Sequence, residues 1–336
     1  MEQESPSPES IFEMLNGHQR TATLKAAIEV ELFTAIQEGC HGTSALAKRC
    51  QASERGIRML ADTVTMLGVL HKNTTGYHLT PESEKFLVKS SPAYLGGTVE
   101  FMLAPPLYDG FRRLTEAVRT GRTALDDQGT IADEHPEWVT FARAMIPMMM
   151  PPAKWIAEYV ASQSWSVNKV LDIAAGHGIF GIEIAKRFPE ANIVAVDWPN
   201  VLEVAKEQAQ TAGVHNRYGT LPGNAFKVDY GGGYDVILLT NFLHHFDPPT
   251  CEGLLRKLNP ALNEHGRVIT LEFVPNEDRV SPASADFALV MLATTPAGDA
   301  YTFKELNAMF INAGFGHSEI HDVPDSKEHV IVTSKS

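Results

Sequence analysis

The chain has few cysteines and no long apolar run, and both absences narrow the class of protein. Three cysteines, Cys40, Cys50 and Cys251, occur in 336 residues, and their wide spacing fits neither a disulfide framework nor a zinc site. So few thiols suit a reducing compartment, and we expect a cytoplasmic protein. No stretch is long enough to cross a bilayer, and the first ten residues are acidic and rich in Pro and Ser, unlike a signal peptide. We therefore expect no membrane partner.

Excess positive charge is also missing. The 28 basic residues stand against 41 acidic ones, giving a formal net charge of −13. A phosphate backbone is bound chiefly by surplus Lys and Arg, so this balance argues against a nucleic-acid partner. The hydrophobic content of 44% is that of an ordinary globular protein, and the length favours two domains.

The first hundred residues form a helical pattern interrupted by one hairpin. Apolar residues recur at three- and four-residue spacing over residues 10–38, which predicts helix. Thr43 or Ser44 is expected to cap a short helix and Ser53 a second one, before a β-hairpin at residues 69–79. Helix, helix and hairpin in this order is the winged-helix arrangement. With nine basic and twelve acidic residues in this part, it favours packing against protein over DNA binding.

Strands and helices alternate in the second half of the chain. Residues 103–152 are helical in pattern but interrupted by prolines, and they contain a methionine cluster at residues 145–150. The alternation beyond that point indicates a doubly wound α/β domain. We expect a mostly helical domain over residues 1–150 and an α/β domain over residues 151–336.

Residues 169–197 carry the most specific pattern in the chain. An apolar strand containing Asp172 leads into a small-residue turn, a helix follows, and a second strand ends on Asp197. Such a unit presents a nucleoside-binding crevice at the carboxyl edge of a parallel sheet.

Two classes of cofactor fit this unit. Its glycines, Gly176, Gly178 and Gly181, also spell the dinucleotide fingerprint, so a nicotinamide or flavin must be weighed. Asp172 separates the classes, because a carboxylate there would repel a pyrophosphate but attract the sulfonium and ammonium groups of S-adenosylmethionine. Asp197 suits either class, since a ribose diol needs a two-oxygen acceptor.

Two histidines follow the central strand that begins at residue 234. His244 and His245 would lie just past its carboxyl end, where ligands bind in such sheets. They are a poor metal site, because adjacent residues rarely face one ion and no third ligand is nearby. One of them could instead be a general base. Glu272, at the end of the next strand, could orient that imidazole; the alternatives are a solvated histidine and a solvated acid.

Further candidate ligand contacts lie in two other segments. Asn224 could hydrogen-bond an adenine edge and Phe226 could pack on its face, although the same residues could form an ordinary turn and a core position. A flat acceptor could be enclosed by thioethers and aromatic rings, which otherwise would be plain core. The acceptor candidates are Phe141, Met145, Met149, Phe287 and Met291.

These motifs together resemble the S-adenosylmethionine-dependent O-methyltransferases of the caffeate and acetylserotonin type, which include bacterial small-molecule enzymes. The resemblance covers nearly the whole chain. It includes residues 141–145, the glycine turn, residues 223–226 and the string Leu-His-His-Phe at 243–246. It implies a Rossmann-like methyltransferase domain and an N-terminal winged-helix module that forms a homodimer. It also implies a small-molecule acceptor and release of S-adenosylhomocysteine.

The resemblance assigns roles residue by residue. His244 takes the place of the base that deprotonates the acceptor hydroxyl, and Glu272 the place of the first of two acids beside it. Asp197 matches the ribose-binding acid, and Asn224 stands where an adenine-binding aspartate is common. The positions expected to hold the cofactor are Asp172, Ala174, Gly176, Gly178, Asp197, Trp198, Asn224, Ala225, Phe226 and Thr240.

Several positions depart from the family pattern. His245 and Phe246 replace an Asp and a Trp, and Thr240 stands where plant members carry a Lys. The second flanking acid aligns with Ala300, with Asp299 one residue away. We therefore expect a methyltransferase that acts on a phenolic or enolic hydroxyl of a small flat metabolite. The alternatives are a C-methyltransferase of the bacteriochlorophyll-type branch, an inactive ligand-binding winged-helix regulator and, third, a nicotinamide oxidoreductase.

Overall fold

The structure is a computed structural model that describes residues 6–324 and 326–335. The residue contacts divide the chain into two compact units, Met1–Val99 and Glu100–Ser336. This division comes earlier in the chain than the boundary we expected near residue 150, and residue 150 lies inside a continuous helix. The expected split of roles between residues 1–150 and 151–336 stays a prediction.

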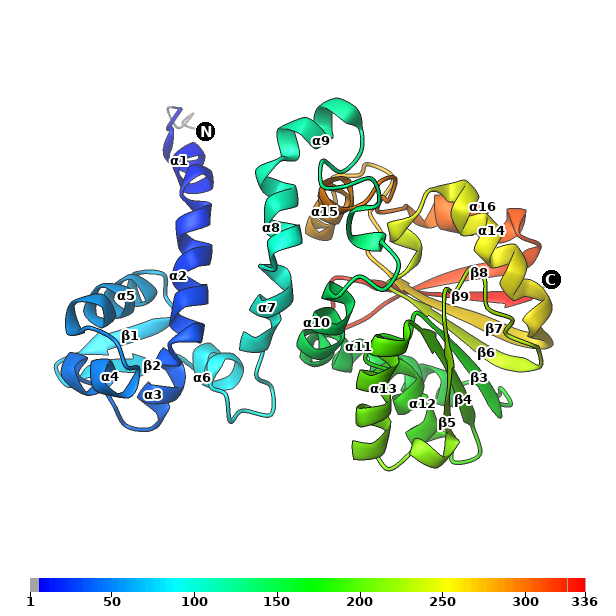
Figure 1. The fold of residues 1–336 in the computed structure, drawn as a ribbon, viewed down its shortest axis with the longest axis horizontal. Helices are drawn as coiled ribbons and strands as arrows, with labels where there is room; N and C mark the ends of the chain where they lie inside the picture. The colour runs from blue at the N-terminus through cyan, green and yellow to red at the C-terminus, as the bar shows by residue number, and fades with distance from the viewer. Residues whose placement is uncertain (1–5, 325, 336) are drawn as a thin grey trace, which may run out of the picture. The chain divides into compact units, whose positions relative to one another are not determined.

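The first unit consists of short helices and one hairpin (Figure 1). Helix α4 (Thr43–Arg49), helix α5 (Glu54–Met66) and the strands β1 (Leu70–Asn73) and β2 (Gly76–Leu79) follow in the expected order of helix, helix and hairpin. The helical pattern over residues 10–38 is divided into three helices, with Glu31 in a left-handed conformation (φ 58°) before the third. These and the remaining helix are α1 (Glu9–Leu15), α2 (Gly17–Glu29), α3 (Leu32–Gln37) and α6 (Pro81–Leu87).

One of the two expected helix caps is confirmed. The Ser53 hydroxyl accepts a hydrogen bond from Gly56 N–H at the start of α5. The cap expected at Thr43 or Ser44 is wrong, because Gly42 occupies the N-cap of α4 and provides no side-chain acceptor. The hydroxyl pattern alone did not reveal where the chain leaves its extended conformation.

Helices precede the sheet in the second unit. They are α7 (Val99–Met102), α8 (Pro105–Arg112), α9 (Leu114–Thr120), α10 (Glu137–Ala144) and α11 (Ile146–Ser162). Prolines begin α8 and α11, as first-turn positions allow. However, Pro151 and Pro152 lie inside α11, so this helix continues through prolines that we expected to interrupt it.

A seven-stranded sheet with the order β5-β4-β3-β6-β7-β9-β8 forms the centre of the second unit. Strand β9 alone runs antiparallel to its neighbours. The strands are β3 (Lys169–Ile173), β4 (Asn192–Asp197), β5 (Tyr218–Pro222), β6 (Tyr234–Thr240), β7 (Leu262–Glu272), β8 (Phe315–Asp322) and β9 (His329–Lys335). The expected doubly wound α/β class is confirmed. The chain order reverses at β3, which pairs with β4 on one side and β6 on the other.

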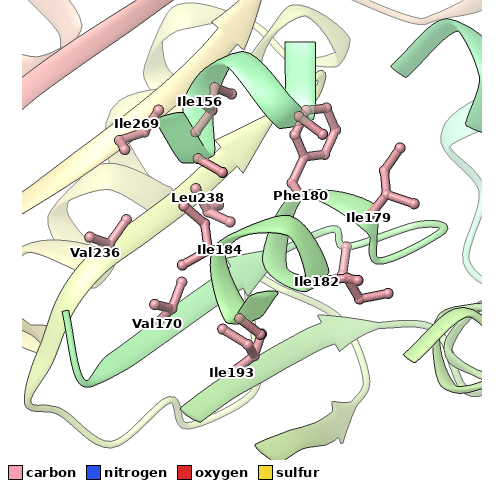
Figure 2. Packing of buried hydrophobic residues seen from close by; sticks show 14 of the residues in the cluster. Ile156, Val170, Ile179, Phe180, Ile182, Ile184, Ile193, Val236, Leu238 and Ile269 are labelled. Carbon is pink, nitrogen blue, oxygen red and sulfur yellow. The ribbon is translucent and has the colours of Figure 1, made fainter. Parts of the chain in front are cut away.

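Helices cover both faces of this sheet (Figure 1). They are α11, α12 (Ile179–Arg187), α13 (Pro199–Thr211), α14 (Pro248–Leu258) and α16 (Phe303–Asn312), whereas α15 (Phe287–Thr294) packs against α8 and α9. Figure 2 shows the branched side chains of α12, such as Ile182 and Ile184, packed over Val170, Ile193 and Leu238 of the strands. This packing holds the carboxyl ends of β3, β4, β6 and β7 at one edge, where a doubly wound sheet binds its ligand.

Candidate active site

The glycine turn between β3 and α12, residues 174–178, is called the cradle below and has a left-handed backbone at three positions. Ala174, Gly176 and Gly178 have φ values of 53°, 55° and 74°. Asp197 closes the cradle from the end of β4, because its carboxylate accepts hydrogen bonds from Gly176 N–H at 2.8 Å and Trp198 N–H at 2.7 Å. A carboxylate has further lone pairs beyond these two bonds, so Asp197 retains acceptor capacity at the strand tip.

Asp172 lies below this cradle and is fully buried. One carboxylate oxygen accepts from Gly181 N–H at 3.2 Å, and the other has no hydrogen-bond partner among the described residues. Burial raises the pKa of Asp172 to about 7 and that of Asp197 to about 6. Asp172 thus braces the first turn of α12, and its direct contact with a cofactor stays a prediction.

His244 and Glu272 form a buried pair at the carboxyl ends of β6 and β7. His244 Nδ1 and Glu272 Oε2 are 2.5 Å apart. The other oxygen of Glu272 accepts from Phe242 N–H at 3.1 Å and Leu243 N–H at 2.8 Å, so one carboxylate fixes both the imidazole and the turn that carries it. With Nδ1 engaged, Nε2 of His244 is the nitrogen left for other chemistry.

His245 is placed differently from His244, although the two ring centroids are 4.2 Å apart. Its ring meets Trp138 of α10 edge to face at 5.2 Å. Burial, and then the neighbouring His244, hold the pKa of His245 well below its usual value. In the part of the chain that the structure describes, no group of three His, Cys, Asp or Glu side chains could hold a metal ion.

Asp299 does not take the place of a second acid beside the imidazole. Its backbone N–H donates to the His244 carbonyl oxygen at 3.0 Å. Its carboxylate, however, accepts from Ala300 N–H at 2.8 Å and lies 3.5 Å from Arg279. The loop therefore supports the His244 backbone, while the Asp299 charge is directed toward Arg279.

Four of the five acceptor candidates come from three helices, and Met145 lies between α10 and α11. Phe141 of α10 lies beside the glycine turn, where an ideal Cβ at Gly176 would be 3.8 Å from its ring. Phe287 of α15 meets the His244 ring edge to face at 4.9 Å. The Met149 sulfur of α11 accepts from Asn241 Nδ2 at 3.3 Å. Met145 and Met291 are buried, Met145 in the same core as Met149. Phe141 and Phe287 thus contact the cradle and the histidine, whereas Met145 and Met291 could be plain core.

The expected adenine contacts lie in the turn after β5. Asn224 Oδ1 accepts from Phe226 N–H at 2.8 Å, so the amide of Asn224 shapes its own turn. Phe226 packs edge to face on Phe246 at 4.9 Å. Of the remaining cofactor candidates, Ala225 and Thr240 are buried and Trp198 packs on α13. Their contact with a cofactor stays a prediction.

Sequence reasoning missed two polar side chains in this unit. Glu328, one residue before β9, is 4% exposed. His177, in the glycine turn, is also buried, and burial lowers its pKa to about 3. His177 could have been flagged because it lies inside the motif. Glu328 gave no local signal, since only the pairing of β9 with β7 brings it to this edge.

The fold and the buried His–Glu pair at a nucleoside-type crevice define a group-transfer enzyme built on a doubly wound sheet. Sequence profiles place it more narrowly: the O-methyltransferase domain matches residues 130–316 and the O-methyltransferase dimerisation domain matches residues 12–89. The chain belongs to the O-methyltransferase family. The expectation of an S-adenosylmethionine-dependent O-methyltransferase with an N-terminal dimerisation domain is confirmed.

Individual relatives agree with this assignment. The 3-hydroxy-5-methyl-1-naphthoate 3-O-methyltransferase of Streptomyces sahachiroi is 28% identical over 91% of this chain and 89% of its own. A crystal structure of a putative O-methyltransferase from Nostoc punctiforme is 52% identical, with a TM-score of 0.95 over 98% of this chain and all of that one. Human N-acetylserotonin methyltransferase shares the fold, with a TM-score of 0.86 and 22% identity over 100% of this chain and 99% of its own.

None of the helices within the described residues is both long and apolar enough to cross a membrane.

Proposed function

We propose that this enzyme methylates a phenolic or enolic hydroxyl of a small flat metabolite, with His244 as the general base. The observation that carries the proposal is the His244–Glu272 contact of 2.5 Å. A carboxylate on Nδ1 fixes the tautomer that leaves Nε2 unprotonated, and it stabilises the imidazolium formed when Nε2 takes a proton.

The residues of the glycine cradle fit S-adenosylmethionine. Asp197 offers carboxylate oxygens at the tip of β4 to a ribose diol. The second acid, Asp172, lies under the same turn and makes the region unfavourable for a pyrophosphate. When bound, the cofactor supplies an electrophilic methyl group on a positively charged sulfur. Asp197, Gly176 and Gly178 are the residues that we expect to hold and orient it.

Deprotonation of the acceptor is the step that this chain must assist. A phenol with a pKa near 10 and an imidazole near 6.5 differ by about 3.5 units, so full proton transfer before attack would cost roughly 5 kcal/mol. Nε2 of His244 therefore removes the proton as the oxygen attacks. Glu272 stabilises the resulting imidazolium, and the buried position of both side chains keeps water from competing.

The walls of the site support a flat acceptor. Phe141 lies beside the glycine turn, and Phe287 stands edge-on to His244 with Phe273 stacked behind it at 3.9 Å. Aromatic faces and a thioether accommodate planar rings. The S. sahachiroi relative is named for a hydroxynaphthoate, and a Streptomyces cremeus relative, 25% identical over 94% of this chain and 87% of its own, for a hydroxybenzoate; both names agree with such an acceptor.

The first prediction concerns the base. Replacing His244 with Ala should lower turnover by roughly 10²–10⁴-fold, because general-base assistance is lost while the cofactor cradle is untouched. The assay is methyl transfer from S-adenosylmethionine to a panel of hydroxylated aromatics, with products identified by mass spectrometry and NMR. Affinity for S-adenosylhomocysteine, measured by calorimetry, should change by less than about threefold.

The matched control for this prediction is His265→Ala, an exposed histidine on β7, which should retain wild-type turnover. Unchanged turnover in the His244 variant would contradict the base assignment. A methyl group found on carbon would contradict the hydroxyl assignment and favour the C-methyltransferase alternative. A thermal shift produced by NAD but not by S-adenosylhomocysteine would contradict the assignment of the cradle.

A further inference from the structure

The turn that presents His244, residues 242–246, is held through both kinds of backbone group. Glu272 accepts two of its N–H groups as well as the imidazole. The carbonyl oxygen of His244 accepts in addition from Asp299 N–H at 3.0 Å. Asp299 belongs to the loop of residues 295–299, which follows α15 and is called the clamp loop below. The clamp loop is therefore a second support of the His244 backbone, separate from Glu272.

Gly298 brings the clamp loop close to the backbone of His244. An ideal Cβ at Gly298 would overlap the His244 carbonyl oxygen and lie 3.1 Å from the His245 carbonyl carbon. Both are backbone atoms, which cannot turn away as the end of a flexible side chain can. A residue without a side chain permits this approach, so the position of the clamp loop and that of the turn are tied to each other.

Thr295 fixes the start of the clamp loop. Its side-chain hydroxyl accepts from Gly298 N–H at 2.9 Å and donates to the Met291 carbonyl oxygen of α15 at 2.8 Å. Its backbone carbonyl oxygen accepts from Thr123 N–H at 3.1 Å. Since Thr295 is only 1% exposed, an apolar side chain of the same shape would keep the packing but leave Gly298 N–H without this acceptor.

Helix α15 reaches His244 from both of its ends. At its first residue, Phe287 meets the His244 ring edge to face at 4.9 Å. At its other end, Thr295 is the C-cap residue and begins the clamp loop, which bonds to the His244 carbonyl oxygen. One helix thus locates both the imidazole and the backbone that carries it.

We propose that Thr295 is a positioning residue whose hydroxyl sets the clamp loop and thereby the backbone of His244. The family resemblance puts a second acid at the position of Ala300, where this chain has none. Here a neutral donor, Asp299 N–H, supports His244, while the negative charge comes from Glu272. The role rests on the proposed function, because placing His244 matters to turnover only if His244 is the base.

The experiment compares Thr295→Val, which removes the hydroxyl but keeps the shape, with Thr295→Ser, which keeps the hydroxyl. We expect the Val variant to lose about tenfold or more in kcat, because a small displacement of a reacting group is costly. The Ser variant should stay within about threefold of the wild type. The acceptor KM and the affinity for S-adenosylhomocysteine should stay within about twofold in both, since the cradle is untouched.

Thr294→Val is the matched control. Thr294 precedes Thr295 in the chain and is also buried. Its hydroxyl makes the same kind of bond to α15, donating to the Val290 carbonyl oxygen at 2.7 Å. The bond from Gly298 N–H, however, goes to Thr295. Removing the Thr294 hydroxyl therefore leaves the clamp loop intact and should keep kcat within about twofold of the wild type.

A proton NMR signal reports the position of His244 without any turnover. The proton of the short His244–Glu272 hydrogen bond should give a far-downfield resonance that is absent in His244→Ala. We expect this resonance to shift or broaden in Thr295→Val and to stay as in the wild type in Thr295→Ser and Thr294→Val. A merely structural role would lower Tm without moving this resonance and without lowering kcat at constant KM.

A second variant covers the case in which Thr295→Val does not fold. Gly298→Ala places a methyl group against the His244 carbonyl oxygen and should push the clamp loop away from the turn, with the same loss in kcat. Adding Thr295→Val to Gly298→Ala should reduce kcat no further, since both changes break one connection. Wild-type kcat in Gly298→Ala would overturn the proposal.

The proposal is also overturned if Thr295→Val turns over like the wild type while His244→Ala does not, or if Thr295→Ser or Thr294→Val is as slow as Thr295→Val. Failure of the proposed function gives a different result, namely unchanged turnover in His244→Ala. The NMR resonance then decides about Thr295. A shifted resonance in Thr295→Val supports the positioning role, and an unchanged one overturns it.

Discussion

Gly181 allows the buried Asp172 to brace the start of α12. An ideal Cβ at this position would lie 2.8 Å from Ile193 Cγ2 and 2.9 Å from Asp172 Oδ2. Both neighbours are buried, and Asp172 is held in place by its bond from Gly181 N–H. A side chain here would therefore push apart the strand, the acid and the turn that forms the cofactor cradle.

Gly181→Ala should accordingly destabilise the protein by about 1–3 kcal/mol, because overpacking of a well-filled site exceeds the gain in helix propensity. Gly253→Ala in α14 is the matched control. It also lies within a helix, but nothing is within 4 Å of its ideal Cβ, so it should be neutral or stabilise by up to about 1 kcal/mol. Urea unfolding of both variants measures the difference. Equal effects would show that the space around Gly181 yields easily.

The acids of the site show how far single residues could be interpreted from sequence. Asp197 and Glu272 end strands, and their predicted positions at the sheet edge agree with the structure. Asp172 was expected to attract the cationic groups of the cofactor; it is buried beneath the turn and accepts from Gly181 N–H, and its contact with a cofactor stays a prediction. Glu328 was not predicted, because its environment is created by a strand pairing between residues far apart in the chain.

At the scale of elements, helix ends depend on a few local hydrogen bonds. Ser53 and Thr302 each accept a bond from the backbone of the first helical turn, and Thr302 forms a complete capping box with Glu305. Thr43, in contrast, is the first residue of α4, follows the N-cap residue Gly42 and makes no capping bond. Hydroxyl residues near helix starts therefore differ in how much they stabilise the helix.

Ser53→Ala should lower the free energy of unfolding of the first unit by about 1 kcal/mol, because a backbone N–H at the start of α5 loses its acceptor. Thr43→Ala is the matched control and should change it by less than about 0.5 kcal/mol. Thermal or chemical unfolding followed by circular dichroism would detect the difference. A similar loss in both variants would mean that the Thr43 hydroxyl also stabilises the start of α4.

Elements with a strong local pattern were predictable, and those stabilised by tertiary packing were not. The hairpin, the glycine unit and β6 follow the expected order with small shifts at their ends. Helix α11 continues through Pro151 and Pro152, because several of its residues, among them Met149 and Ile156, are buried in the core. Strand β5 was not predicted, since its sequence offers little alternation and its place depends on pairing with β4.

At the scale of the whole molecule, the first unit presents apolar surface that its own core does not cover. Four large side chains of α1, Ile11, Phe12, Met14 and Leu15, are each more than half exposed. The matching sequence profile is that of a dimerisation domain. We propose that the enzyme is a homodimer and that these residues contribute to the contact between subunits, since contiguous exposed apolar surface marks interaction sites.

This proposal leads to the last prediction, which concerns assembly. The wild type should have the mass of a dimer, whereas the double variant Phe12→Glu with Leu15→Glu should have the mass of a monomer at micromolar concentration, because it places two charges in a desolvated contact. Met66→Glu is the matched control: Met66 is 85% exposed at the end of α5, and charging it should leave the dimer intact. Light scattering measures the mass, and circular dichroism confirms that each variant is folded. A dimer that survives the double change would exclude α1 from the subunit contact, and a monomeric wild type would refute the homodimer itself.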